Sequence, residues 1–354
     1  MIKIQDSIDH ANPELFLLTK CNNLYLYLNQ RLADDTDYKK ASLIKKLDKL
    51  LVESSTQNYI RTKAGGSAIT ATRHRGFFSY LAANNYLKLK ALIISKPNDM
   101  LLLINEINLI LQAGDLFIEN GGTISQTEFG KLLSGRLFKY STYRVSQFCV
   151  DTYLELGFGR ATCVYCNIER TSIVSKSRGG GVSHRIRFDL DHFFPQARYP
   201  YFALSFYNHI PSCHGCNSQI KGEKDFKLTT HIHPYFESFD NVYKFSISAT
   251  ALHSQIVNEI MINESGTKNG DITVTDLELY ENYQVENGNV EELVTVLRDY
   301  EHLLNPTDIE GFKSMIFNVV GVKQFRKDIL SKSNSKLKRD ITKIFDCDNL
   351  MQLD

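Results

Sequence analysis

The sequence predicts an α+β protein in three parts: a mainly helical N-terminal domain, a central core built around four cysteines, and a mixed α/β C-terminal region. Three observations carry this prediction. Apolar residues recur at helical spacing early in the chain, two Cys-x-x-Cys pairs bracket its middle, and short alternating stretches mix with helical ones after it. The expected parts are residues 1–158, 159–225 and 226–354, which suits a chain of 354 residues.

Composition and charge are those of an ordinary globular protein. Hydrophobic residues make up 43% and charged residues 23%, and the formal net charge is +1. Between residues 160 and 225, nine basic residues stand against five acidic ones, a local net charge of +4. Such a patch attracts phosphates, although a solvated surface is the alternative explanation.

Cysteine usage and the first residues predict a cytoplasmic protein. Three of the seven cysteines, Cys21, Cys149 and Cys347, are scattered singles, most simply buried thiols. An odd number of cysteines without a secretion signal argues against a disulfide framework. The longest apolar stretches, such as residues 100–104, are far too short to span a membrane, so no membrane association is expected.

The N-terminal part is expected to be helical because its apolar residues recur every three or four positions. Leu17, Cys21 and Leu24 follow this spacing, and residues 39–52 repeat it with lysines on the opposite side. We expect this domain to serve targeting or partner docking.

A second unit is predicted at the end of the N-terminal part. Residues 123–157 contain two short amphipathic segments joined by a tight link, with three basic residues nearby: Arg136, Lys139 and Arg144. The pattern resembles a helix-turn-helix, and an ordinary helical hairpin is the alternative.

The middle of the chain is expected to hold a loop and a strand. The glycine run 179–181 predicts a flexible loop. Residues 184–190 then alternate, with Ile186 and Phe188 on one side and Arg185 and Arg187 on the other, which predicts a half-exposed strand. Asp191 and His192 follow at its end.

The C-terminal part mixes both kinds of element. Residues 245–248 and 272–275 are rich in β-branched and aromatic side chains and predict strands. Three later stretches have helical periodicity, at residues 285–304, 308–319 and 335–345.

The two cysteine pairs have the spacing of zinc knuckles. Each of Cys163-x-x-Cys166 and Cys213-x-x-Cys216 presents two thiolates from one turn, and together they complete a tetrahedron. Four thiolates leave no position for water, so this Zn²⁺ would be structural. A redox pair or unrelated buried cysteines are the alternatives, and His214 is not needed as a ligand.

Polar residues between and after the cysteines extend the pattern. In order they are Asp191, His192, Pro195, Asn208, Asn217 and Lys221. With the cysteines, this order and spacing resemble the HNH endonucleases, also called ββα-metal nucleases, in their four-cysteine zinc-binding form. The resemblance covers residues 163–221 alone. Asn217 stands where some members of the family carry a histidine, and an asparagine there also supplies a metal ligand.

The resemblance implies a division of roles among these residues. His192 would be the general base that deprotonates a water molecule. Asp191 and Asn217 would hold one catalytic divalent ion, Mg²⁺ or Mn²⁺. Asn208 would brace the loop between two strands and keep His192 oriented, and Lys221 would contact a phosphate.

Several further residues are candidates with open roles. Asp189 shares a strand face with Asp191 and is an alternative metal ligand or a partner for His192. Arg185 and Arg187, on the exposed side of the predicted strand, are candidate substrate-binding residues. Two other groups are expected to be structural or packing residues: the pair His231 and His233, and His209, for which a substrate contact is the alternative.

The leading hypothesis is a metal-dependent endonuclease that cleaves DNA. The resemblance implies a setting in bacterial anti-phage defence or restriction, with an ATPase or another defence-system protein as a partner. Three rivals remain: a ribonuclease, a non-catalytic zinc module that binds nucleic acid, and a purely structural partner protein.

Overall fold

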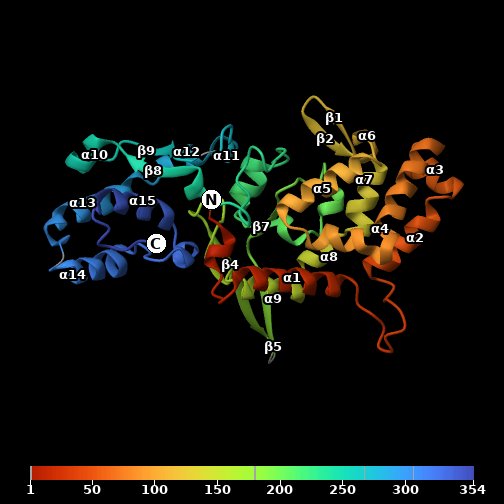
Figure 1. Ribbon diagram of the computed structural model, residues 1–354, viewed down its shortest axis with the longest axis horizontal. Helices are drawn as coiled ribbons and strands as arrows, with labels where there is room; N and C mark the ends of the chain where they lie inside the picture. The colour runs from red at the N-terminus through yellow and green to blue at the C-terminus, as the bar shows by residue number, and fades with distance from the viewer. Residues whose placement is uncertain (1, 179–180, 267, 306) are drawn as a thin grey trace.

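The computed structural model describes residues 2–178, 181–266, 268–305 and 307–354. Helices and four small antiparallel sheets make up the described part of the chain, an α+β protein as the sequence predicts. Figure 1 shows an elongated molecule with the helical N-terminal elements at one end and the C-terminal elements at the other. Gly179 and Gly180, where a flexible loop is predicted, lie outside the described residues.

The first helices begin at side-chain caps. Ser42, Thr56 and Ser67 each accept a hydrogen bond from the backbone N–H three residues later, which satisfies a donor that the first helical turn leaves open. The elements before residue 117 are η1 (Ile4–Ser7), α1 (Pro13–Leu28), α2 (Leu43–Glu53), α3 (Gln57–Lys63), α4 (Ala68–Ile94), α5 (Pro97–Asn108) and α6 (Ala113–Leu116).

A small hairpin and four short helices complete the N-terminal part. They are β1 (Phe117–Asn120), β2 (Thr123–Gln126), α7 (Glu128–Leu132), η2 (Leu133–Leu137), α8 (Tyr140–Arg144) and α9 (Gln147–Glu155). Arg136 forms an ion pair with Glu53, and Arg144 donates to the backbone carbonyl of Phe188. Two of the three basic side chains expected beside a helix-turn-helix therefore bind groups of the protein itself.

The middle of the chain contains two antiparallel sheets. The first joins β3 (Arg160–Thr162), β4 (Arg170–Arg178) and β5 (Gly181–Ile186), and the second pairs β6 (Asp189–His192) with β7 (His209–Ser212). Three short helices accompany them: η3 (Pro200–Phe202), η4 (Phe206–Asn208) and η5 (Gly215–Lys221).

The single strand predicted over residues 184–190 is wrong. The chain leaves the first sheet after Ile186 and enters the second at Asp189. Between them the buried ring of Phe188 packs against Tyr153 and Phe158, with ring centroids 6.1 and 5.9 Å away. The alternating residues therefore belong to two strands in different sheets, and the chain changes direction between them at Phe188, whose ring packs in the core.

The C-terminal part pairs β8 (Tyr243–Ile247) with β9 (Ile260–Glu264). The strand predicted at residues 272–275 is wrong, because these residues form α11 (Thr273–Asp276). The carboxylate of Asp271 accepts from the backbone N–H of Thr273 at 2.9 Å and starts the helical turn. The remaining elements are η6 (Phe239–Asn241), α10 (Ala249–Ser254), α12 (Leu279–Gln284), α13 (Asn287–Asp299), η7 (Glu301–Leu303), α14 (Ile309–Ser314), η8 (Met315–Val320), η9 (Arg326–Ser331) and α15 (Ser335–Phe345).

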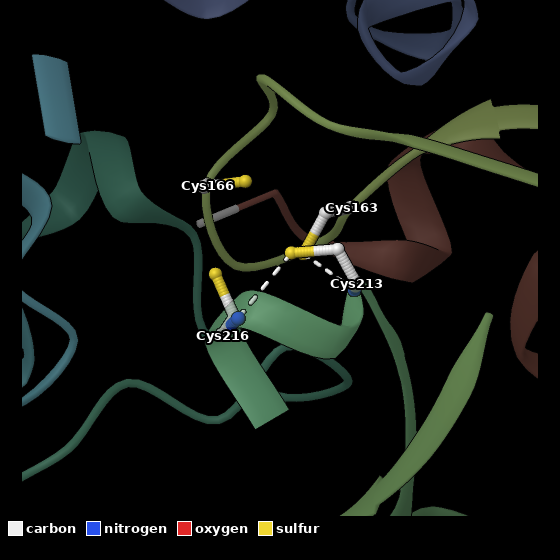
Figure 2. Close-up of side chains that lie close together, drawn as sticks. All are labelled: Cys163, Cys166, Cys213 and Cys216. Atoms are coloured by element: carbon white, nitrogen blue, oxygen red, sulfur yellow. Dashed lines mark hydrogen bonds between the residues drawn. The ribbon is translucent and has the colours of Figure 1, made fainter. Parts of the chain in front are cut away.

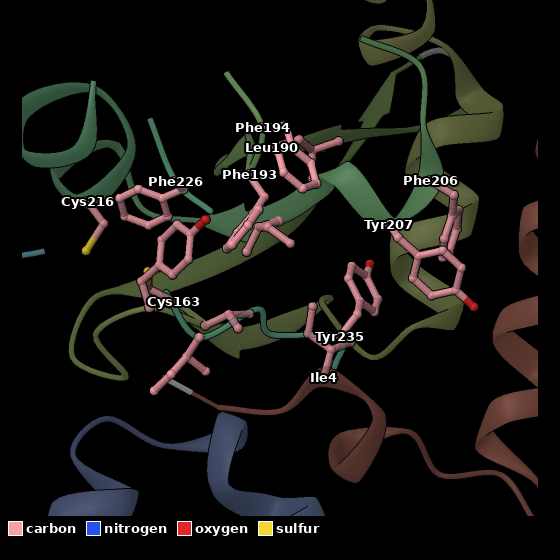
Figure 3. Packing of buried hydrophobic residues seen from close by; sticks show 14 of the residues in the cluster. Ile4, Cys163, Leu190, Phe193, Phe194, Phe206, Tyr207, Cys216, Phe226 and Tyr235 are labelled. Atoms are coloured by element: carbon pink, nitrogen blue, oxygen red, sulfur yellow. The ribbon is translucent and has the colours of Figure 1, made fainter. Parts of the chain in front are cut away.

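Apolar side chains under the β6–β7 hairpin connect the parts of the molecule. Figure 3 shows Leu190 and Phe193 of the hairpin segment with Phe226, close to Cys163 and Cys216. The chain start runs into the same region, because the Ile2 N–H donates to the Val164 carbonyl at 2.8 Å. No helix within the described ranges is long and apolar enough to cross a membrane.

Asn167 joins the first cysteine turn to the C-terminal part. Its buried side chain donates to Thr162 Oγ1 at 2.7 Å and to the Ile329 carbonyl at 3.3 Å, and accepts from the Lys336 backbone N–H at 2.9 Å. Its backbone has a φ of 53°, in the left-handed region that asparagine tolerates better than most residues. One side chain thus fixes two segments far apart in sequence.

Asn167→Ala should lower the free energy of unfolding by roughly 2–4 kcal/mol, because it leaves buried polar groups without partners. Urea denaturation followed by circular dichroism measures this change. Asn263→Ala is the matched control, since the Asn263 amide makes a single exposed hydrogen bond to Ser246 and its loss should cost under about 0.5 kcal/mol. Equal effects of the two substitutions would contradict the role of Asn167.

Candidate functional site

The four paired cysteines meet in one buried cluster. Their sulfur atoms lie within 4.8 Å of one another, and among the described residues they form the one group of three or more His, Cys, Asp or Glu arranged to hold a metal ion. Figure 2 shows the side chains pointing toward one another from two turns. A donor set of four sulfurs is one that Zn²⁺ favours.

Backbone hydrogen bonds shape the two cysteine turns. The Cys213 N–H donates to the Cys163 sulfur at 3.2 Å, and the Cys216 N–H donates to the Cys213 sulfur at 3.4 Å. The Val164 N–H donates to the Pro211 carbonyl at 3.3 Å, which ties the first turn to β7. The cluster therefore fixes both ends of the segment that contains β6, β7 and η5.

Asp191 lies between two proton donors that come from these turns. Its carboxylate accepts from the Tyr165 hydroxyl at 2.5 Å and from the Lys221 ammonium at 3.0 Å. Tyr165 lies within the first cysteine turn, and Lys221 ends η5, which carries Cys216. The Lys221 and Asp191 side chains are 1% and 3% exposed, so theirs is a buried ion pair.

This position of Lys221 differs from the one expected from the sequence. A phosphate contact requires an accessible ammonium, but Lys221 points inward and also donates to the backbone carbonyl of His192 at 2.8 Å. The side chain thus ties η5 to the end of β6, where both Asp191 and His192 lie.

His192 is half-buried at the edge of a cleft, and its ring is oriented by the backbone. Its Nε2 lies 3.1 Å from the carbonyl oxygen of Ala203, which can only accept a hydrogen bond. Nε2 therefore carries the proton and Nδ1 is left as the basic nitrogen. Burial lowers the pKa of His192 from its usual value, which favours the neutral ring.

Asn208 braces the loop that supplies this carbonyl. Its fully buried amide accepts from the Phe194 N–H at 2.7 Å and donates to the carbonyls of Phe194 and Phe202 at 3.1 and 3.2 Å. Phe202 directly precedes Ala203. The amide thereby holds the loop across residues 194–208 and, through Ala203, the ring of His192.

His209 supports the same loop from inside the protein. It is fully buried, and its Nε2 also donates to the Ala203 carbonyl, at 2.9 Å. The ring stacks on Tyr143 of α8, and burial lowers its pKa to about 3. These contacts make His209 a packing residue that does not reach the cleft.

A cleft of about 780 Å³ gathers most of the predicted site residues. Asp189, Asp191, His192, Asn217 and Lys221 all line it. Asp189 accepts from the Asn217 amide at 3.0 Å and faces the exposed His214 ring at 3.1 Å, so its partners differ from the predicted contact with His192.

Residues of the N-terminal part also line the cleft. Lys131, Tyr140 and Arg144 line it together with the motif residues, and the Tyr140 ring meets the His192 ring edge to face at 4.6 Å. The sequence alone did not reveal these lining residues, because they lie outside the motif, which begins at Cys163. Arg185 and Arg187 are exposed and do not line the cleft.

Oxygen atoms in the cleft form a donor set suited to a hard cation. The carboxylates of Asp189 and Asp191 and the side-chain carbonyl of Asn217 are the groups that Mg²⁺ and Mn²⁺ prefer. Both oxygens of Asp191 already accept hydrogen bonds, from Tyr165 and Lys221. Asp189 and Asn217 are therefore the less encumbered donors.

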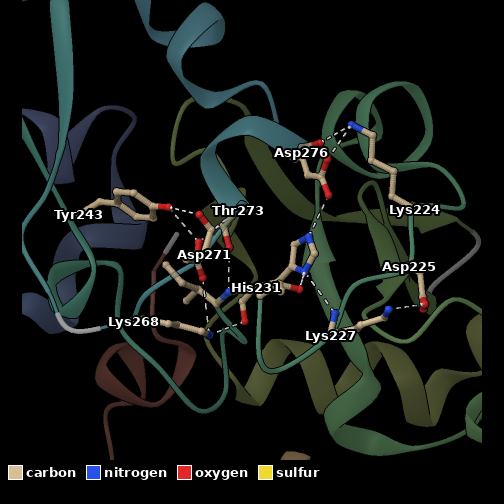
Figure 4. Close-up of polar contacts among 11 residues, drawn as sticks. Lys224, Asp225, Lys227, His231, Tyr243, Lys268, Asp271, Thr273 and Asp276 are labelled. Atoms are coloured by element: carbon tan, nitrogen blue, oxygen red, sulfur yellow. Dashed lines mark hydrogen bonds and ion pairs between the residues drawn. The ribbon is translucent and has the colours of Figure 1, made fainter.

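His231 and His233 lie apart from this cleft. Figure 4 shows His231 between Asp276 and the segment of Lys227, with its Nε2 donating to Asp276 at 2.9 Å. His233 is fully buried against Phe193, and burial lowers its pKa to about 3. The two rings make separate contacts, and neither belongs to a metal cluster within the described part of the chain.

Comparisons with models of known families, with curated proteins and with solved structures find no match. The resemblance to HNH endonucleases therefore remains a prediction carried by the motif residues between Cys163 and Lys221. The geometry of the cleft bears on function independently of this resemblance.

Cys166→Ser should remove the metal from the four-cysteine cluster and destabilise the protein, since three thiolates leave the site open. We expect elemental analysis of the purified wild type to give one zinc per chain and the variant to give much less, with a lower melting temperature. Cys347→Ser is the matched control, because Cys347 is exposed and outside the cluster. A metal-free wild type with an unchanged melting temperature in the variant would contradict the assignment.

Lys221→Met should lower the free energy of unfolding by roughly 3–5 kcal/mol, because it leaves the buried Asp191 carboxylate without its counter-ion. Chemical denaturation at neutral pH measures this effect. Lys224→Met is the control, since Lys224 and Asp276 form a partly exposed pair at 3.8 Å whose loss should cost at most about 1 kcal/mol. If both variants were equally stable, the Lys221–Asp191 contact would not be the anchor inferred above.

Proposed function

We propose that the protein is a divalent-metal-dependent HNH endonuclease that hydrolyses phosphodiester bonds in DNA. The observation that carries this proposal is the state of His192. The Ala203 carbonyl orients the ring through Nε2, burial lowers the pKa of the imidazole, and His192 lines a cleft together with two carboxylates and an amide. A positioned neutral imidazole beside oxygen ligands is what metal-assisted hydrolysis of a phosphodiester requires.

The local architecture supports the same proposal. The hairpin β6–β7 is followed directly by the short helix η5, which is the strand–strand–helix order of a ββα-metal core. In this proposal Zn²⁺ in the four-cysteine cluster closes the core and takes no part in the chemistry. The catalytic ion is a separate Mg²⁺ or Mn²⁺.

The residues of the cleft divide the chemical work. His192 accepts the proton of the attacking water at Nδ1 and remains oriented through Nε2. Asp191 and Asn217, with Asp189 beside them, would hold the divalent ion, which supplies charge stabilisation for the phosphate and the leaving oxygen. Lys221 is a positioning residue, because it fixes the Asp191 carboxylate and the His192 backbone.

Two rival functions use the same geometry. A ribonuclease needs the same general base, since hydrolysis of a phosphodiester does not select the sugar. A non-catalytic zinc module would keep the fold and would not depend on the imidazole. The biological setting implied by the resemblance, anti-phage defence or restriction with an ATPase partner, stays a prediction.

His192→Ala should abolish nicking of supercoiled plasmid, with a loss of at least roughly a hundredfold, because a positioned general base contributes about that much. Gel electrophoresis after incubation with Mg²⁺ or Mn²⁺ measures the loss, and chelation of these ions should stop the wild type. His253→Ala is the matched control, since His253 is exposed on α10 and should cleave as the wild type does.

The same experiment separates the rivals. Cleavage of RNA but not plasmid would favour the ribonuclease. Nucleic-acid binding with no cleavage by the wild type, and no change in His192→Ala, would favour the non-catalytic module and contradict the proposal.

A further inference from the structure

One face of the sheet β3–β4–β5 carries four arginines. Arg160 pairs with Ser172, Arg170 with Thr162, and Arg185 with Val174 in the antiparallel register. Directly paired residues share a face, as do residues two apart on one strand. Residues 170, 172 and 174 of β4 point to the same face of the sheet, since each is two positions from the next. Arg170 is one of them, and Arg160 and Arg185 pair with the other two, so these three arginines lie on one face.

Arg187 extends the same face at the end of β5. Its backbone N–H donates to the Ser172 carbonyl at 2.8 Å, so it lies beside Ser172, across β4 from Arg160. All four arginines are exposed. The opposite face is apolar, with Ala161, Thr171, Ile173 and Ile186 all buried against the body of the protein.

The charge of this face is not balanced within the sheet. The strands β3, β4 and β5 contain five basic residues and no acidic one. Several arginines elsewhere pair with carboxylates, as Arg73 does with Asp115 and Arg198 with Glu119. Within the described residues, none of the four arginines of this face has such an ion pair. Mutual repulsion between them gives the fold no benefit, which argues for an external anionic partner.

The arginine face ends two residues before a residue of the cleft lining. Arg187 lies two residues before Asp189, the first residue of β6 and part of the cleft lining. The four arginines lie along residues 170–174 of β4, a stretch about 13 Å long at the usual rise of a strand. A polyanion bound along the face would therefore lie, at one end, beside the segment that enters the cleft lining.

We propose that the face formed by Arg160, Arg170, Arg185 and Arg187 is the docking surface for the sugar–phosphate backbone of duplex DNA. This inference rests on the proposed nuclease function and adds the surface that brings the substrate to the cleft. Guanidinium groups bind phosphate oxygens bidentately. The face offers charge without amide side chains to read base edges or ribose hydroxyls, so the docking is independent of sequence.

Binding can be measured apart from cleavage in the His192→Ala protein. The probe is a fluorescent 30-base-pair DNA duplex, titrated by anisotropy at several KCl concentrations. Two double variants are compared in this background: Arg160→Gln with Arg170→Gln, and Arg185→Gln with Arg187→Gln. Each should weaken binding roughly tenfold or more and reduce the slope of log K against log salt by about 1.8, which corresponds to two lost phosphate contacts.

Two further variants guard against trivial explanations. Arg160→Lys with Arg170→Lys keeps the charge and should retain most of the affinity. Arg75→Gln with Lys244→Gln removes two exposed cations from α4 and β8 and should leave the affinity and the salt slope unchanged. Circular dichroism and thermal melting of each variant show that the fold is intact.

The outcomes are distinct. Unchanged affinity and salt slope in both arginine pairs would overturn the docking surface, whatever the wild type cleaves. Arginine-dependent binding of an RNA duplex but not of DNA would overturn the choice of partner. Arginine-dependent binding of DNA together with a wild type that cleaves nothing would support the surface and contradict the nuclease function.

Discussion

The site depends on the four-cysteine cluster that joins two turns fifty residues apart in sequence. Tyr165 lies in one turn and Lys221 follows the other, and the two converge on the carboxylate of Asp191. The four cysteines do not line the cleft, yet the two turns that they join hold both donors. A metal in this cluster would act by position alone, because it would fix a hairpin and a short helix that are too small to be stable by themselves.

The loop between the two strands of the hairpin supplies the second constraint. Asn208 fastens it from within, and the Ala203 carbonyl then orients His192. Tyr140 and Arg144 of the N-terminal part also line the cleft. The cleft is thus lined by residues of both the central core and the helical part.

Site residues that must have a given type at a fixed spacing could be predicted from the sequence. Site residues whose role depends on the course of the backbone could not. The cysteine pairs could be recognised because a tetrahedral site demands two thiolates from each of two turns. The group that orients His192 could not be recognised, because it is the backbone carbonyl of Ala203, and a residue type does not tell where its carbonyl points. The inward turn of Lys221 also escaped, since a lysine one helical turn after Asn217 fits a phosphate contact equally well. The bend at Phe188 was hidden by a continuous alternation of apolar and polar residues, and only the packing of its ring shows that two sheets meet there.

The most direct test of this account is plasmid cleavage by protein stripped of its tightly bound metal and then assayed with excess magnesium. The account predicts that the stripped protein is inactive with magnesium alone and that restoring zinc to the cysteine cluster recovers cleavage, because the cluster holds Tyr165 and Lys221 on Asp191. Cleavage by the stripped protein at the rate of the intact one would contradict it.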